Sequence, residues 1–149
     1  MCRCILYSAL LMLVAGSGCG NGTDLPPSDP DLREALGLDD QVRIHRIDLS
    51  GRGAESRVLP ATLEIQEGEV VQFVTLDRRI HHIRFVTDSL SPAAARFLEQ
   101  TGQSSSPPLV RRGSRFVLSF EGAPAGLFPY VVEGYGDPVV GRIRVRPPP

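Results

Sequence analysis

Three histidines and one tyrosine are the side chains of this sequence best suited to metal chemistry. His81 and His82 are adjacent, His45 is the only other imidazole, and Tyr135 carries a phenol in the C-terminal part of the chain. Imidazole nitrogens and phenolate oxygens can both ligate a transition metal. Neighbouring side chains of a strand point to opposite faces, so His81 and His82 cannot easily share one ion. Tyr135 is the further donor that could join His81.

The alternation around His81 predicts where its side chain lies. In the segment His81-His82-Ile83-Arg84-Phe85, residues 81, 83 and 85 share one face of a strand, which we interpret as the core face. His82 and Arg84 share the other face. A histidine at the rim of a core can also be purely structural, with its ring hydrogen-bonded to backbone, and this alternative stays open.

Enzymatic motifs are missing from the sequence. It contains no serine nucleophile elbow, no cluster with metal-ligand spacing and no glycine-rich phosphate loop, and Gly51-Arg52-Gly53 and Gly134-Tyr135-Gly136 are interpreted as turns. The acidic residues have no spacing that marks a catalytic pair. The arginines are scattered, apart from the pairs Arg78-Arg79 and Arg111-Arg112 and the alternation of Arg142, Arg144 and Arg146, and this distribution argues against nucleic-acid binding. We therefore expect a protein that is not an enzyme and has no nucleic-acid partner.

Residues 1–18 have the layout of an export signal. A short positive start, an apolar run over 5–15 and the small residues 16–18 precede Cys19. The layout resembles a bacterial lipoprotein signal, in which this cysteine is lipidated, although such signals usually have an aliphatic residue where Gly16 stands. Ordinary cleavage near Ala15 or Gly18, leaving a free Cys19, is the alternative. We expect a protein exported to the cell envelope or periplasm and attached to a membrane through a lipid on Cys19.

Export also removes the remaining thiols. Cys2 and Cys4 lie inside the signal, so the folded domain has no cysteine for a disulfide, a metal or a nucleophile. Residues 19–40 are interpreted as a flexible tether, rich in Gly, Pro, Ser, Asn and Asp, with a short helix over 31–38 that Asp31 begins and Gly37 ends.

Residues 41–149 have the pattern of an all-β domain. Runs of alternating apolar and polar residues predict strands near 42–47, 58–66, 69–76, 80–87, 114–120, 127–133 and 139–145. Glu67-Gly68 is interpreted as a hairpin-like turn. Short strands separated by turns predict an antiparallel β-sandwich of about seven strands. The predicted core consists of Leu63, Ile65, Val71, Phe73, Ile83, Phe85, Phe116, Leu118, Phe120, Tyr130, Val132, Ile143 and Val145.

One inserted helix interrupts the β pattern. Ser91 can cap its start, Pro92 suits the first helical position, and Gly102 follows its end, so a helix near 92–101 is predicted. We favour a surface helix that packs Phe97 and Leu98 on the sandwich over a binding lid.

The order of motifs from Leu59 to Val145 resembles the cupredoxins, the plastocyanin-like blue copper proteins. The segment 81–85 resembles the family's His-x-Ile/Val-x-Phe strand. The closing segment 126–145 resembles the family's last two strands through Gly126, Phe128, Tyr130, Gly141, Ile143 and Val145. The resemblance implies a Greek-key sandwich.

The copper ligands of that family are mostly absent. A blue copper site uses two imidazoles, a cysteine thiolate and a weak axial ligand, usually Met. The resemblance places His81 at the first histidine, Val132 at the cysteine, Tyr135 at the second histidine and Val139 at the methionine. A frame one residue earlier uses Val131 and Gly134 and also supplies no ligand.

Two functions follow from the resemblance. The first is a non-enzymatic, membrane-tethered cupredoxin-like module with a degenerate copper site and a binding or structural role, for which we expect no cofactor. The second is a copper-binding or electron-transfer protein that uses an atypical site around His81. The sequence names no ligand or protein partner for either.

Overall fold

The computed structural model describes residues 29–147, and eight strands run through them. In chain order they are β1 (Ile44–Arg52), β2 (Glu55–Leu59), β3 (Thr62–Gln66), β4 (Val70–Thr75), β5 (His81–Phe85), β6 (Arg115–Ser119), β7 (Gly126–Gly134) and β8 (Val139–Arg146). Two short α-helices, α1 (Pro30–Leu36) and α2 (Pro92–Gln100), and the 3-10 turn η1 (Thr87–Ser89) complete the elements. None of these helices is long and apolar enough to cross a membrane.

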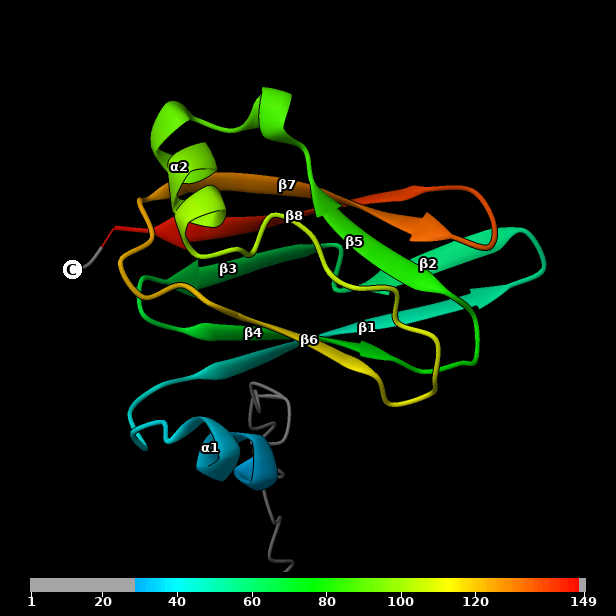
Figure 1. Ribbon diagram of the computed structural model, residues 1–149, viewed down its shortest axis with the longest axis horizontal. Coiled ribbons are helices and arrows are strands. Elements are labelled where there is room, and N and C mark those ends of the chain that lie inside the picture. Colours follow the sequence, from blue (N-terminus) through cyan, green and yellow to red (C-terminus); the bar gives the residue numbers. More distant parts are fainter. Residues whose placement is uncertain (1–28, 148–149) are drawn as a thin grey trace, which may run out of the picture.

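The strands form two four-stranded sheets packed face to face (Figure 1). Sheet A has the order β2-β1-β4-β6, and sheet B has the order β3-β8-β7-β5. The predicted β-sandwich is therefore confirmed. The sheets are mixed rather than purely antiparallel, because β1 pairs with β4 and β3 pairs with β8 in parallel.

The strand count differs from the expected seven because the run 58–66 is divided. Pro60 has no N–H to donate to a ladder, and the chain leaves sheet A after Leu59 and enters sheet B at Thr62. The turn at Glu67-Gly68 does not close a hairpin either. It carries the chain from β3 in sheet B to β4 in sheet A. Both corrections have one physical cause, which is that a sandwich buries apolar strands equally well whichever sheet they join.

The core lies between the sheets and is built largely from the predicted residues. Eleven of the predicted residues are buried, whereas Leu63 and Phe116 are partly buried and pack against the cluster. Phe85, Phe120 and Tyr130 are among its largest fully buried side chains. The ring of Phe128, which the prediction missed, meets Phe120 edge-on at 5.5 Å.

The inserted helix α2 has the predicted caps and packing. The Ser91 side chain accepts a hydrogen bond from the N–H of Ala94, and Pro92 begins the helix. Ala94, Phe97 and Leu98 are buried against the sandwich. The helix is thus part of the core rather than a detached element.

Helix α1 lies against the outer face of sheet A. Its N-cap is Asp29 instead of the expected Asp31, and Gly37 ends it in the left-handed conformation with φ of 61°. Asp29 also forms an ion pair with Arg115 of β6 at 2.6 Å, and Leu32 is buried. This part of the expected tether is therefore docked on the domain. The predicted export signal and Cys19 lie outside the described residues.

Candidate functional site

His81 begins β5 at one end of the sandwich. Its N–H donates to the carbonyl of Leu109 at 3.0 Å, and the Leu109 N–H donates back at 2.8 Å. The side chain is turned inward and only 3% of the residue is exposed, with Ile83 and Phe85 buried on the same face. The predicted alternation is observed, since His82 and Arg84 lie on the outer face.

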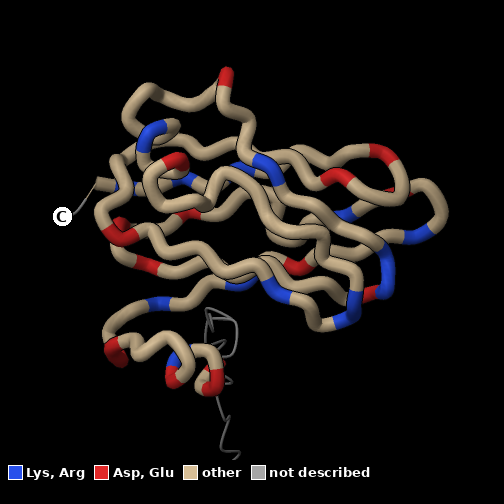
Figure 2. Tube along the Cα trace, viewed as in Figure 1, with Lys and Arg blue, Asp and Glu red and all other residues tan. Residues whose placement is uncertain are grey.

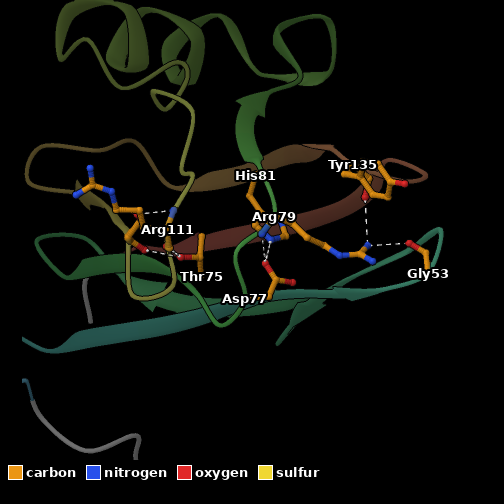
Figure 3. A network of polar contacts seen from close by, with 8 residues as sticks. Gly53, Thr75, Asp77, Arg79, His81, Arg111 and Tyr135 are labelled. Atoms are coloured by element: carbon orange, nitrogen blue, oxygen red, sulfur yellow. Dashed lines mark hydrogen bonds and ion pairs between the residues drawn. The ribbon is translucent and has the colours of Figure 1, made fainter.

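The His81 ring is held by a carboxylate from the β4–β5 loop. Its Nε2 lies 2.8 Å from Oδ1 of Asp77, which also accepts from the backbone N–H of Arg79 at 2.9 Å (Figure 3). Burial raises the pKa of Asp77, but the hydrogen bonds from His81 and from Arg79 outweigh it and leave the pKa below its usual value. Asp77 is therefore ionised at neutral pH. An ionised carboxylate can only accept, so Nε2 carries the proton of that bond.

Val132 and Val139 replace ligands with hydrocarbon. Val132 is 2% exposed and lies in sheet B between Ile83 of β5 and Val139 of β8. Val139 packs against the same core cluster. A valine side chain has no lone pair to donate to a metal. The two valines occupy the positions where the family resemblance places a thiolate and a thioether.

The alternative alignment, which is shifted by one residue and uses Val131 and Gly134, also supplies no metal ligand. Gly134 lies opposite His81 in the β5–β7 ladder, and a Cβ at this position would be 1.9 Å from the carbonyl oxygen of Ile80. No side chain can be accommodated there without moving the backbone.

Tyr135 points outward at the β7–β8 turn. Tyr135 is 70% exposed, and the guanidinium of Arg79 lies 5.2 Å from the centre of its ring. Nη1 of Arg79 donates to the carbonyl of Gly53 at 2.8 Å and to that of Tyr135 at 3.4 Å (Figure 3). Arg79 thus joins the β1–β2, β4–β5 and β7–β8 loops, and we call this contact set the Arg79 latch.

The three histidine side chains interact with different carboxylates and do not converge on one site. His45 Nε2 lies 2.7 Å from Oε2 of Glu69, where β1 and β4 begin, and His82 is 4.0 Å from Glu133 on the outside of sheet B. Within residues 29–147, no group of three or more His, Cys, Asp or Glu side chains is placed to hold a metal ion. One imidazole without a thiolate does not fit a blue copper centre.

Solved structures with the same architecture include plastocyanin. The chain superimposes on oxidised plastocyanin from Dryopteris crassirhizoma with a TM-score of 0.53 and 14% identity, over 68% of this chain and 99% of that one. The chain has the cupredoxin fold. This confirms the fold expected from the motifs in 59–145.

Two further solved structures are similar to this chain. A copper-containing nitrite reductase from Thermus scotoductus matches with a TM-score of 0.50 and 20% identity, over 72% of this chain and 23% of that one. A purple cupredoxin from Nitrosopumilus maritimus matches with a TM-score of 0.46 and 21% identity, over 68% of this chain and 99% of that one. No protein-family model and no curated protein matches the sequence. At these identities the likeness concerns the cupredoxin fold alone.

Asp77 and Arg79 are the site residues that the sequence did not reveal. Asp77 precedes His81 by four residues, in a loop whose path no periodicity predicts. The sequence offered one indication of this contact. Asp77 is a carboxylate a few residues before the inward-facing His81, and such a carboxylate can hydrogen-bond the imidazole ring.

Proposed function

We propose that this chain is a non-enzymatic cupredoxin-fold module, exported and tethered to a membrane through Cys19, whose copper end has been converted to a structural or binding role. The observation that carries the proposal is the pair Val132 and Val139. Both pack on the core where the resemblance places a cysteine and a methionine. Rebuilding a soft copper site there would require replacing buried hydrocarbon with sulfur ligands.

The Arg79 latch supports this proposal. In the copper-binding members, ligands from a mid-chain strand and from the loop between the last two strands meet at the metal, which holds the two segments together. Here the guanidinium of Arg79 joins the loop before β5 to the loop after β7 by hydrogen bonds and by contact with Tyr135. The latch keeps this end of the sandwich closed by means other than a metal.

Copper titration tests the proposal. The chain from residue 19 onward with Cys19→Ser contains no thiol, and it is titrated with Cu(II) and Cu(I) and followed by optical spectroscopy and calorimetry. We expect a colourless protein with weak binding that His81→Ala leaves unchanged. Stoichiometric tight binding that His81→Ala abolishes would contradict the proposal.

That contrary result would establish the second candidate, a copper carrier or electron-transfer protein with an atypical site. One observation favours it. Asp77 holds Nε2 of His81, and no hydrogen bond from the described residues reaches Nδ1. A neutral imidazole with a fixed Nε2–H has its lone pair on Nδ1, which is the arrangement that a metal-binding histidine needs.

A further inference from the structure

Two neighbouring loops at the His81 end of the sandwich expose a surface that is both apolar and basic. One loop joins β4 to β5, and the other leads into β6. They are tied together by the paired backbone bonds of His81 with Leu109 and by the Gly113 N–H, which donates to the carbonyl of Thr75 at 2.7 Å. We call the exposed side chains of these loops the arginine-loop surface: Leu76, Arg78, Ile80, Val110, Arg111 and Arg112.

The apolar part of this surface is built by the strand register. His81 pairs with Leu109 in an antiparallel bridge, so Ile80 lies opposite Val110. The side chains of His81 and Leu109 are buried, and those of Ile80 and Val110 therefore point outward. Ile80 is 53% exposed and Val110 is 50% exposed, and Leu76 of the first loop is 38% exposed. Exposed aliphatic side chains that lie next to each other, as Ile80 and Val110 do, are a feature of contact surfaces.

The basic part has little local compensation. Arg78, Arg111 and Arg112 are exposed, and none of the three forms an ion pair with another residue of the range 29–147. Asp77 is the only carboxylate in the two loops, and its Oδ1 is already bound by His81 and by the N–H of Arg79.

Negative charge collects elsewhere on the same side of the molecule. Exposed carboxylates lie on α1, at Asp31 and Glu34, and in the turn after it, at Asp39 and Asp40. Figure 2 shows these acidic positions at the lower left and the basic loops at the lower right. An anionic surface would be attracted to the basic loops and repelled by the acidic helix α1. This charge distribution determines which end of the sandwich faces such a surface.

The chain enters the described structure beside these loops. Asp29, its first residue, pairs at 2.6 Å with Arg115, which directly follows the second loop. The roughly ten residues between Cys19 and Asp29 span at most about 35 Å when fully extended. A lipid on Cys19 would therefore keep the arginine-loop surface close to the bilayer.

We propose that the arginine-loop surface docks on an anionic lipid bilayer. The arginines contact lipid phosphates, for which the guanidinium geometry is well matched, and Ile80 and Val110 enter the boundary between headgroups and acyl chains. The proposal rests on the proposed function only for the tether that brings the loops to the membrane. An acidic protein would be attracted by the same arginines, but within residues 29–147 no feature brings such a protein to this end of the sandwich.

Vesicle binding tests the proposal without the anchor. The chain 20–149 retains all eight strands and the core, and it lacks Cys19 and the apolar segment. We expect it to sediment with phosphatidylcholine vesicles that contain phosphatidylglycerol and to stay in solution with phosphatidylcholine alone. Arg111→Ala with Arg112→Ala should lower the partition coefficient by tenfold or more, since each arginine near an anionic surface contributes about fivefold. Added salt should weaken binding as well.

A matched control removes two arginines from another face. Arg142 and Arg144 are exposed on β8, and their double alanine variant should bind vesicles like the wild type. A second readout locates the contact. The chain 20–149 has no cysteine, so Val110→Cys gives a single site for a polarity-sensitive dye. The control is Leu127→Cys, near the start of β7 and thus at the opposite end of that strand from His81.

Three outcomes would overturn the proposal. They are no binding of the wild type to anionic vesicles, an equal loss in the β8 control, and an equal dye response at positions 110 and 127. Binding to soluble polyglutamate but not to vesicles, again lost with Arg111 and Arg112, would reassign the surface to an acidic protein. Because this chain lacks Cys19, none of these results depends on lipidation, and the copper titration tests the proposed function separately.

Discussion

The phenol ring of Tyr130 lies directly against the α-carbon of Gly141, its partner in the β7–β8 ladder. A Cβ at position 141 would be 2.3 Å from both Cζ and Oη of Tyr130. The ring cannot withdraw, because Phe73 meets it edge-on at 5.0 Å and Phe85 at 6.1 Å. The absence of a side chain at position 141 is thus what allows the largest buried residue of the core to fit.

Gly141→Ala should therefore destabilise the domain. The added methyl group overlaps a ring that is locked by its neighbours, and overpacking of this kind costs about 1–3 kcal/mol. The midpoint of chemical unfolding measures the loss. Val140→Ala, at an exposed neighbouring position, is the control and should change stability by less than about 0.5 kcal/mol. Equal midpoints for the two variants would refute the packing relationship.

Tyr130→Phe should leave the domain at least as stable as the wild type. The Tyr130 hydroxyl is buried and has no hydrogen-bond partner among the described residues, and burial raises its pKa, which keeps it neutral. Removing an unsatisfied hydroxyl removes a desolvation cost. Equilibrium unfolding is the measurement. A loss above about 1 kcal/mol would show that the hydroxyl has a partner, such as a buried water.

Asp77→Asn should remove a pH-dependent part of the stability. The pKa of Asp77 is lowered on folding, so its stabilising effect is fully present above its ordinary value of 3.8 and is lost as the pH falls through the lower folded value. At neutral pH the variant should lose roughly 1–3 kcal/mol, because the hydrogen bonds to a charge are weakened. The gap to the wild type should narrow as the pH falls below 3.8 and through the lower folded pKa.

Unfolding curves across that pH range make the comparison, with Asp137→Asn as the control in an exposed loop. A gap between the wild type and Asp77→Asn that stays constant with pH would argue against an ionised Asp77 beside His81.

Arg79→Ala should loosen the loops that the Arg79 latch joins. The amide of Asp137 donates to the carbonyl of Ala54 at 3.0 Å, which makes its hydrogen exchange a local reporter of contact between the β7–β8 and β1–β2 turns. We expect faster exchange at Asp137 and a global loss of about 1 kcal/mol, because the latch is partly exposed. Arg57→Ala, on the exposed edge strand β2, should leave the amide unchanged. Unaltered exchange in Arg79→Ala would show that the loops hold together without the latch.

Cys19→Ser should release the protein from membranes. In the proposed function a lipid on Cys19 is the attachment, and the serine hydroxyl cannot be thioether-linked. Fractionation of cells and the intact mass of the purified protein measure the change. A wild-type protein that is soluble after export and carries no added lipid mass would eliminate the anchor.

The fold was predictable where it depends on periodicity. Alternation alone placed His81, Ile83 and Phe85 on the buried face, and it placed Val132 in the core. The pairing of strands was less accessible, because an apolar strand satisfies the same pattern in either sheet. Residues 58–66 were therefore predicted as one strand followed by a hairpin-like turn, whereas β3 is a separate strand that pairs with β8.

The site depended on loops, and loops have no period. The bond between Asp77 and His81 and the contact of Arg79 with Gly53 join segments whose approach is set by tertiary structure. The docking of α1 was hidden for the same reason, since Asp29 and Arg115 are 86 positions apart.

The parallel pairing of β3 with β8 affects how this domain folds. Glu64 and Arg146 are 82 residues apart in sequence and ion-paired across that ladder, so sheet B cannot be completed until the last strand is available. Contacts this distant in sequence require a long loop to close first, and sandwiches of high contact order fold in milliseconds to seconds rather than microseconds. During that interval β3 and β7 lack the strand that lies between them, and their unpaired edges are open to other chains. The C-terminal strand is thus both the last to arrive and the one that ends this exposure.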